Sequence, residues 1–265
     1  MKPYYEHGGI TIYHGDCREV LPTLADESVD MIWTDPPYGH NNLDGDLAAS
    51  RVGVRGARQA APTPIANDSP EEFRKVMDAM LTEAARVLKA DCCCCCCCGG
   101  GGGPSPTFAW VAERMDREGL AFFHAVIWDK SGRGNWLGWR YRRNYEMVMV
   151  AHRVGGKLRW ADDALAVPNI VRMAPPRNRL HPNEKPQELS SKFISLHSYP
   201  DDLVLDPFMG SGTTLSAAKG LGRRAIGIDT AEAYCEIAAR RLSQEVFEFP
   251  LVAEPTVATQ GGLDI

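Results

Sequence analysis

The sequence predicts an α/β fold in which a mostly parallel β-sheet lies between layers of helices. Two observations support this class. Four short apolar segments each have an acidic residue within three residues of their carboxyl ends. Segments with the apolar spacing of helices lie between them, so strand and helix alternate as they do in parallel sheets. Because such sheets bind ligands at the carboxyl ends of their strands, we expect the four acids to line one cleft.

The predicted strands and helices can be placed by residue. The strands and their acids are residues 10–13 with Asp16, 29–34 with Asp35, 203–205 with Asp206, and 225–228 with Asp229. The longest predicted helix runs from Pro70 to Leu88 and follows Ser69, whose hydroxyl suits the cap of a helix N-terminus. Two further helices are predicted at Leu215 to Lys219 and at Ala231 to Leu242.

Composition narrows the class of protein. The chain of 265 residues is 44% hydrophobic and 24% charged, which suits one large or two small globular domains. No apolar run approaches the roughly 18 residues that a membrane span requires. The N-terminal MKPYYEHGG lacks the basic and apolar parts of a signal peptide. We therefore expect a cytoplasmic protein without membrane contact.

Seven of the nine cysteines are consecutive, from Cys92 to Cys98. Neighbouring side chains of a strand point to opposite faces, so we do not expect the run to converge on a metal ion, and we predict no metal site. The favoured interpretation is a buried central strand that continues the helix ending near Leu88, with cysteine acting as a small apolar residue. Redox or metal chemistry is the alternative. The glycines from Gly99 to Gly103 predict a turn with close backbone approach.

The net charge of −5 conceals a basic segment. From Lys130 to Arg179 there are eleven basic residues and three acidic ones, with four Trp and Tyr residues between Trp136 and Tyr145. This mixture is typical of a nucleic-acid surface, whereas a solvated face beside a structural aromatic cluster is the alternative. The stretch from Gly39 to Asn67 lacks periodicity and is interpreted as a mobile loop over the cleft, or as a plain linker.

The tetrapeptide Asp35-Pro36-Pro37-Tyr38 gives the most specific chemical signal. Two prolines stiffen the backbone directly after a carboxylate, so side-chain and carbonyl oxygens are held with little freedom. Such acceptors can bind both hydrogens of an exocyclic amine and favour a pyramidal, nucleophilic nitrogen. Tyr38 supplies an aromatic plane on which a base extruded from a duplex can stack. A plain turn between strand and loop is the alternative.

Residues 206–214, DPFMGSGTT, form a second motif between a predicted strand and a predicted helix. Gly210 and Gly212 lie where the backbone must approach a ligand closely. A dinucleotide site would need a third glycine at Leu215, so nicotinamide and flavin cofactors fit poorly. Asp229 follows about twenty residues later, where a carboxylate can accept both hydrogens of a ribose diol. A nucleoside cofactor without a pyrophosphate fits this pair best.

These motifs resemble those of the DNA amino-methyltransferases, which modify adenine N6 or cytosine N4. DPPY resembles the family's catalytic tetrapeptide, and DPFMGSGTT resembles its S-adenosylmethionine loop. HPNEKP at residues 181–186 resembles the segment before that loop, and HGDC at residues 14–17 resembles the segment that contacts the adenine of the cofactor. The resemblance spans nearly the whole chain. Because the catalytic motif precedes the cofactor loop, the order resembles the circularly permuted β group.

The resemblance implies a Rossmann-like fold of S-adenosylmethionine-dependent methyltransferases, with a mostly parallel, seven-stranded, circularly permuted sheet. The implied catalytic residues are Asp35, Pro36, Pro37 and Tyr38, with Asp35 accepting the amine. The implied cofactor residues are Asp16, Lys185, Asp206, Phe208, Gly210, Ser211, Gly212, Thr213 and Asp229. For two of these a structural role stays open, because Asp16 also suits a helix cap and Lys185 also suits a helix entry beside Pro186.

The basic segment resembles the family's target-recognition region in its flanks, Trp128-Asp129-Lys130 and residues 142–146. The implied DNA contacts are Lys130, Arg133, Arg140, Arg142 and Arg143. Arginines here either read guanine edges or hold phosphates. The chain then divides into a catalytic half at 1–128 with the mobile loop 39–67, a recognition segment at 129–180 with a sheet strand near 146–151, a cofactor half at 181–245, and a tail at 246–265.

The expected activity is site-specific methylation of adenine N6 in double-stranded DNA, by base flipping and direct in-line transfer from S-adenosylmethionine. Cytosine N4 is the close alternative, because both reactions need the same amine geometry. Methylation of RNA or of a protein glutamine is a more distant one, and a catalytically silent DNA-binding module comes last. The resemblance suggests a homodimer and a cognate restriction endonuclease as further partners.

Overall fold

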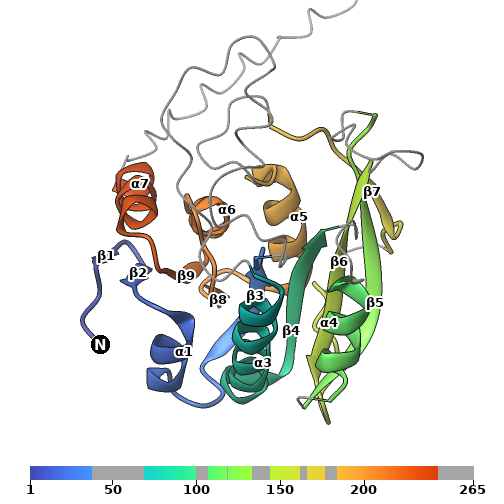
Figure 1. Cartoon of the computed structure of the whole chain (residues 1–265). Coiled ribbons are helices and arrows are strands. Elements are labelled where there is room, and N and C mark those ends of the chain that lie inside the picture. Colours follow the sequence, from blue (N-terminus) through green and yellow to red (C-terminus); the bar gives the residue numbers. More distant parts are fainter. Residues whose placement is uncertain are drawn as a thin grey trace, which may run out of the picture.

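The structure, a computed structural model, describes residues 1–37, 69–99, 107–117, 119–132, 144–161, 166–176 and 184–243. Within these residues the strands form a sheet that has helices on both sides (Figure 1). The predicted α/β class is therefore confirmed. None of the helices in this part of the chain is long and apolar enough to cross a membrane. The predicted loop at 39–67 and the tail at 246–265 lie outside the described residues.

Nine strands of the described chain form one sheet, in the order β1-β2-β9-β8-β3-β4-β6-β5-β7. They are β1 (Tyr5–His7), β2 (Ile10–His14), β3 (Val29–Thr34), β4 (Leu88–Gly99), β5 (Leu120–Asp129), β6 (Tyr145–Arg153), β7 (Ile170–Arg172), β8 (Leu203–Asp206) and β9 (Arg224–Asp229). Five neighbouring pairs are parallel and three, which involve β1 or β6, are antiparallel. The sheet is mostly parallel as expected, but the predicted number of seven strands is wrong. β1 and β7 have three residues each, too few to show a periodic apolar pattern.

The parallel strands bring the four predicted acids to one edge of the sheet. β2, β9, β8, β3 and β4 run in the same direction, so their carboxyl ends lie together. Asp229 and Asp206 end their strands, while Asp16 and Asp35 follow theirs. β3 and β8 are neighbours, yet the chain continues from β3 to β4 on one side and from β8 to β9 on the other. This switch in strand order is the place where open α/β sheets bind ligands.

Helices cover both faces of the sheet. They are α1 (Cys17–Val20), the 3-10 helix η1 (Leu21–Thr23), α3 (Pro70–Val87), α4 (Thr107–Met115), α5 (Gln187–His197), α6 (Thr213–Gly220) and α7 (Glu232–Ser243). Figure 1 shows α5, α6 and α7 on one side of the sheet, and α1, α3 and α4 on the other. Buried apolar side chains form two clusters, one under each helical layer.

The longest helix, α3, begins where the sequence predicts. The Ser69 hydroxyl accepts a hydrogen bond from the backbone N–H of Glu72 at 3.2 Å, which satisfies a donor that the first turn leaves without a partner. Glu71 and Glu72 add negative charge near the positive end of the helix dipole. At the other end, Leu88 is already extended and begins β4 directly.

The cysteine run forms the middle of β4 and is buried on both faces. Cys92 to Cys97 are at most 3% exposed, which confirms the predicted central strand. The even-numbered cysteines pack with side chains of α3 and α4, whereas the odd-numbered ones pack with side chains of α5. Small apolar side chains at every position allow both helical layers to pack on this strand. Of the predicted glycine turn, residues 100–103 lie outside the described chain.

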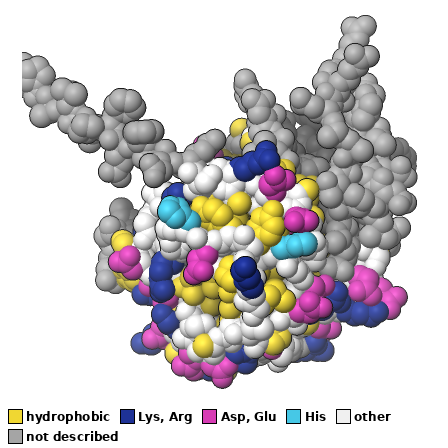
Figure 2. Space-filling model, turned by 90° about the vertical axis from the view of Figure 1, so that its left-hand side faces the viewer, with side chains coloured by type: hydrophobic (Ala, Val, Ile, Leu, Met, Phe, Trp, Pro, Cys, Tyr) yellow, Lys and Arg dark blue, Asp and Glu magenta, His cyan; other side chains and the backbone are white. Residues whose placement is uncertain are grey.

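Figure 2 shows the side of the molecule that carries the β1–β2 hairpin. Hydrophobic side chains gather in the middle of this side, and acidic and basic side chains are mixed around them. Among the residues described there, Lys and Arg do not form a continuous patch. The strands that the described part of the basic segment contains, β6 and β7, lie toward the opposite edge of the sheet.

The turn between β8 and α6 packs tightly against its neighbours. Gly212 has a φ of +78°, and a Cβ at this position would lie 2.8 Å from Cβ of Ala238 in α7. Gly227 in β9 lies under the same turn, where a Cβ would lie 2.5 Å from Sδ of Met209 and 2.8 Å from Leu215. The absence of a side chain at both glycines therefore lets this turn approach α7 and β9 closely.

Gly212→Ala is expected to destabilise the fold more than Gly222→Ala. Both glycines have a left-handed φ, +78° and +73°, so alanine strains the backbone at each, by about 1 kcal/mol. Nothing lies within 4 Å of the new methyl at Gly222, whereas at Gly212 the methyl collides with α7. Gly212→Ala should therefore lower the free energy of unfolding by about 1–3 kcal/mol more than its control. Urea unfolding followed by circular dichroism measures both variants, and equal losses would contradict the packing argument.

Candidate active site

The carboxylate of the DPPY motif lies at the switch point of the sheet. β3 is buried along its whole length, and Asp35 is the next residue. Pro36 and Pro37 follow and restrict the backbone on the far side of the carboxylate. The Asp35 side chain is 25% exposed, so it lies at the boundary between core and solvent. The structure therefore presents the predicted acceptor on a rigid support, while Tyr38 lies outside the described residues.

Lys185 connects Asp35 to a second carboxylate. Its Nζ lies 2.7 Å from Oδ2 of Asp35 and 3.0 Å from Oε2 of Glu146, near the start of β6. The other oxygen of Glu146 accepts a hydrogen bond from Nζ of Lys130 at 2.5 Å. The end of β3, the segment before α5, and the adjoining ends of β5 and β6 therefore meet in one network of charges.

The network is largely buried, and its members determine each other's ionisation. The side chains of Lys185, Lys130 and Glu146 are 8%, 13% and 15% exposed. Burial raises the pKa of Glu146, but Lys185 and Lys130 outweigh burial and lower that pKa to about 2. Burial lowers the pKa of Lys185, whereas Asp35 and Glu146 raise it, and the net shift is upward. Two ammonium groups thus balance two carboxylates, which is how buried charges are tolerated.

Two predicted site residues have partners in the structure that the sequence did not suggest. Lys185, predicted as a cofactor residue, contacts the predicted catalytic carboxylate and directly precedes Pro186, the cap residue of α5. Lys130, predicted as a DNA contact, is engaged with Glu146 and lies over the Trp128 ring, 5.1 Å from its centre. Glu146 was not predicted as a site residue. Its signals were its position at the start of an apolar strand and at the end of the 142–146 flank.

Asp206 joins the end of β8 to the end of β3. Its Oδ1 accepts hydrogen bonds from the Thr34 hydroxyl at 2.7 Å and from the Phe208 N–H at 3.1 Å. Thr214 adds a further side-chain hydrogen bond. Burial raises the pKa of Asp206 to about 6, although these three hydrogen bonds lower it. The predicted catalytic and cofactor segments therefore share a buried polar contact.

Asp229 holds the predicted cofactor loop from the neighbouring strand. Its Oδ2 accepts a hydrogen bond from the Gly210 N–H at 3.0 Å, and its Oδ1 accepts one from the Ala231 N–H at 2.8 Å. Burial raises the pKa of Asp229, while these two hydrogen bonds lower it. Each carboxylate oxygen has more than one acceptor site, so these bonds orient Asp229 and are compatible with a ribose diol. Ser211, in the same loop, is buried.

A polar cluster fastens the segment before α5 to the same loop. Oε1 of Glu184 lies 3.2 Å from the donating Thr213 hydroxyl and 3.0 Å from Nη1 of Arg241. Arg241 also donates to Gln187 at 3.0 Å. Thr213 was predicted as a cofactor residue, whereas Glu184 and Arg241 were not. Glu184 lies inside the HPNEKP motif, which could have indicated it, but nothing in the sequence indicated Arg241.

Asp16 caps a helix at the same edge of the sheet. Its Oδ1 accepts a hydrogen bond from the Arg18 N–H at 2.9 Å, and its Oδ2 pairs with the Arg18 guanidinium at 2.6 Å. The helix-cap interpretation of Asp16 is therefore confirmed. The Gly15 N–H donates to the backbone carbonyl of Asp229 at 2.9 Å, so Asp16 also lies next to the strand end that holds the cofactor loop. A contact with the cofactor stays a prediction.

The structure thus brings the described members of the predicted catalytic and cofactor sets to one edge of the sheet. The predicted site residues outside the described chain are Tyr38, Arg133, Arg140, Arg142 and Arg143. The first half of HPNEKP, residues 181–183, also lies outside it.

Comparison with known proteins agrees with this geometry. Residues 29–240 match the DNA methylase family of N6 and N4 methyltransferases. This chain belongs to that family. The Type II methyltransferase M2.DpnII of Streptococcus pneumoniae is 29% identical over 259 residues, which cover 92% of this chain and 93% of the relative. The Type II methyltransferase M2.LlaDCHI of Lactococcus lactis subsp. cremoris is 28% identical over 258 residues, with the same coverage of 92% and 93%.

Solved structures of DNA methyltransferases share the fold. The complex of M1.HpyAVI with S-adenosylmethionine has a TM-score of 0.65 at 24% identity, covering 89% of this chain and 100% of that one. The cytosine-N4-specific PvuII DNA methyltransferase has a TM-score of 0.70 at 21% identity, covering 92% of this chain and 89% of that one. The shared fold is therefore one that holds S-adenosylmethionine in the M1.HpyAVI complex.

The residues at the strand ends fit this cofactor. The glycine turn from β8 to α6 brings backbone to the edge of the sheet, and Asp229 is oriented at the end of the adjacent strand. A dinucleotide site would carry a third glycine at position 215, but this chain has Leu215 there, and its side chain is fully buried. S-adenosylmethionine has a ribose but no phosphate, so it needs the turn and the carboxylate without a pyrophosphate cradle.

Asp206→Asn is expected to flatten the pH dependence of stability. Burial raises the pKa of Asp206 from 3.8 to about 6, so folding favours the protonated carboxyl. This stabilisation is present below pH 3.8 and is lost as the pH rises through about 6. Asparagine keeps an oxygen for Thr34 and Phe208 and does not ionise. The difference in unfolding free energy between variant and wild type should therefore be more favourable at pH 7.5 than at pH 4, by up to about 3 kcal/mol. Urea unfolding at both pH values measures it, and equal differences would contradict the assignment.

Proposed function

We propose that this protein transfers the methyl group of S-adenosylmethionine to the N6 amino group of adenine in double-stranded DNA. The ion-paired Asp35 carboxylate is the observation that carries the proposal, because it is held on a rigid proline segment next to the cofactor loop. Aspartate, rather than serine, before Pro36 and Pro37 favours adenine over cytosine at the level of the family resemblance.

The side chains at the switch point suit this chemistry. S-adenosylmethionine supplies a methyl group on a positively charged sulfur, which is a good leaving group. The amino nitrogen of the base attacks that methyl carbon, an N–C bond forms as the C–S bond breaks, and the nitrogen loses one proton. The nitrogen lone pair is delocalised into the base, so acceptors that bind its hydrogens and favour a pyramidal geometry promote the attack. Asp35 is that acceptor, and it takes up the released proton.

Lys185 acts as a positioning residue in this proposal. Its ammonium holds Oδ2 of Asp35 at 2.7 Å, and Glu146 holds Lys185 in turn at 3.0 Å. A reacting group works best when a second layer of contacts fixes its rotamer. The Lys130 contact to Glu146 at 2.5 Å completes that layer from β5. The charge network therefore keeps the acceptor in place while substrates bind and leave.

DNA must reach Asp35 as a flipped base. An amino group stacked inside a duplex is inaccessible to a carboxylate at the edge of a sheet, so the target base leaves the stack. In this proposal Tyr38 stacks on the base, and residues 129–180 recognise the target. Contacts with phosphates and bases fall to four of the arginines of this segment, because the Lys130 ammonium is engaged with Glu146. These arginines are Arg133, Arg140, Arg142 and Arg143.

The motif order supports the circularly permuted β arrangement, with a catalytic half at 1–128 and a cofactor half at 181–245. β3, which the DPPY motif follows, precedes β8 and its cofactor loop in the chain, and β8 lies beside β3 in the sheet. We place the protein in the cytoplasm. A homodimer and a cognate restriction endonuclease are the further partners proposed, the latter supported by two relatives that are named Type II methyltransferases.

Nucleoside analysis of methylated DNA tests the proposed reaction. The protein is incubated with isotope-labelled S-adenosylmethionine and unmethylated genomic DNA, and the digested DNA is examined by mass spectrometry. We expect labelled N6-methyladenine. Labelled N4-methylcytosine would overturn the choice of base and keep the mechanism; the fold alone allows this outcome, because a cytosine-N4-specific enzyme shares it. Label in RNA or protein only, or cofactor binding without any product, would overturn the DNA assignment.

Asp35→Ala and Asp229→Ala should separate catalysis from cofactor binding. Asp35→Ala removes the amine acceptor, so kcat should fall by about 100- to 1000-fold while the cofactor Kd stays near wild type. Asp229→Ala removes the group that orients the loop and the expected ribose acceptor, so the cofactor Kd should rise by about 10- to 100-fold. Calorimetric titration and single-turnover transfer measure the two quantities. Glu236→Ala, on the exposed face of α7, is the control. Full turnover by Asp35→Ala would remove this residue from the mechanism.

A further inference from the structure

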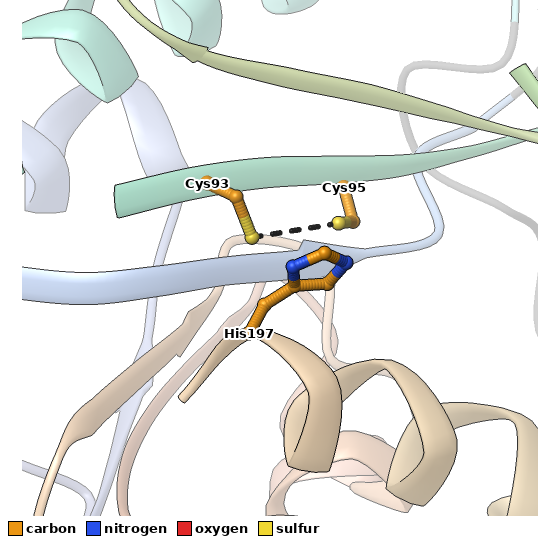
Figure 3. A group of neighbouring side chains, drawn as sticks. All are labelled: Cys93, Cys95 and His197. Atoms are coloured by element: carbon orange, nitrogen blue, oxygen red, sulfur yellow. Dashed lines mark hydrogen bonds between the residues drawn. The ribbon is translucent and has the colours of Figure 1, made fainter. Parts of the chain in front are cut away.

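A group of metal-ligating side chains lies apart from the candidate active site. Cys93 and Cys95 of β4 and His197 at the end of α5 are buried, and their ligand atoms lie within 4.8 Å of one another (Figure 3). We propose that these three residues form a binding site for a soft metal ion, Zn²⁺ or Cu⁺. The test of this site does not rely on methyl-transfer activity.

The two sulfurs have the spacing that a shared metal ion needs. Cys93 and Cys95 are two residues apart in a strand, so they point to the same face, and their Sγ atoms are 3.7 Å apart. Two Zn–S bonds of about 2.3 Å at a tetrahedral angle place the sulfurs about 3.8 Å apart. The spacing therefore allows alternate cysteines to share a metal ion, a case that the expectation of no convergence did not consider.

His197 is oriented to supply the third ligand. Its Nδ1 lies 2.7 Å from the backbone carbonyl oxygen of Arg159, a contact in which the ring N–H donates. The proton on Nδ1 leaves the lone pair of Nε2 for a metal, the arrangement found in most metal-binding histidines. The ring also packs edge-on against Trp160, with ring centres 5.2 Å apart. In Figure 3 the imidazole projects from α5 toward the sulfurs of β4.

The donor set selects the class of metal. Two thiolates and an imidazole favour Zn²⁺ or Cu⁺, whereas Mg²⁺ and Ca²⁺ prefer oxygen ligands. When Zn²⁺ binds, the two thiols release their protons to solvent, and the charge of the ion cancels that of the two thiolates. No redox change is needed. A neutral site suits these surroundings, because the odd-numbered cysteines pack among apolar side chains such as Phe193 and Ile194.

The opposite face of β4 offers a matched comparison. Cys94 and Cys96 are as buried as Cys93 and Cys95, and their Sγ atoms are also 3.7 Å apart. Within the described chain, a histidine completes a cluster of three ligands only on the side of α5. The spacing of the sulfurs is thus the same on both faces, and His197 is the difference. If metal binding needs all three residues, it should be lost when Cys93 and Cys95 are replaced and kept when Cys94 and Cys96 are replaced.

Metal analysis of the whole protein tests the site. Wild type and three variants are produced in cells given zinc or copper salts, purified under reducing conditions, dialysed, and examined by elemental mass spectrometry. The variants are Cys93→Ala with Cys95→Ala, His197→Phe, and the control Cys94→Ala with Cys96→Ala. We expect one metal ion per chain in wild type and control. The other two variants each lack at least one ligand of the site. Their affinity for the metal should fall by at least roughly 10- to 100-fold, which is what the loss of a residue that only supports a ligand costs.

The identity of the bound element distinguishes zinc from copper, and cobalt supplies a second readout. Wild type produced with Co²⁺ should show the ultraviolet absorption of a thiolate–cobalt bond and a higher melting temperature than metal-free protein, and the control should show both. A wild type without stoichiometric zinc, copper or cobalt overturns the proposal, even if a variant fails to fold. Equal metal content in all variants, or loss of metal in the control alone, overturns it as well.

Discussion

The ion pair between Lys185 and Asp35 is the contact on which the arrangement of the site depends. It joins the end of β3 to the segment before α5, two parts of the chain that are 150 residues apart, at a distance of 2.7 Å. The second contact of Lys185, with Glu146 at 3.0 Å, adds the start of β6. Removing the Lys185 ammonium would leave the carboxylates of Asp35 and Glu146 close together in a largely buried place. The loss of stability would be far larger than the stability that an exposed ion pair contributes. The same contact therefore fixes the three segments and the Asp35 carboxylate.

Two buried carboxyl groups of this site have opposite pKa shifts, and their partners explain the difference. Glu146 faces Lys185 and Lys130, which lower its pKa to about 2 despite burial. Asp206 is bound by hydroxyl and backbone donors, which do not carry a full charge, so burial raises its pKa to about 6. The negative charge of Glu146, next to Asp35, is thus strongly stabilised, whereas that of Asp206, at the end of β8, is only weakly stabilised. Asp206 is suited to joining two strands, whereas the Glu146 network is suited to holding a charged acceptor.

The sequence predicted those features that depend on neighbouring residues. The strand ends with their acids, the Ser69 cap and the buried cysteine strand all follow from local patterns, and the structure has each of them. The site contacts that were missed depend on strand register. Glu146 reaches Lys185 because β6 runs antiparallel to β4, with Glu146 opposite Gly99. No spacing within the sequence encodes that pairing. The grouping of His197 with Cys93 and Cys95 was missed for the same reason, since about a hundred residues separate the ligands.

Helix α5 connects the two sites through one rigid element. Lys185 lies two residues before its first residue, Gln187, and His197 is its last residue. Eleven helical residues rise about 16 Å, so the helix spans from the charge network at the sheet edge to the cysteine face of β4. At one end, ionic contacts hold the chain to Asp35; at the other, the histidine lies against two sulfurs. A metal ion at the second end would fix the helix to the central strand and thereby restrict the movement of Lys185 relative to β3. The position of the acceptor carboxylate then depends on contacts at both ends of α5.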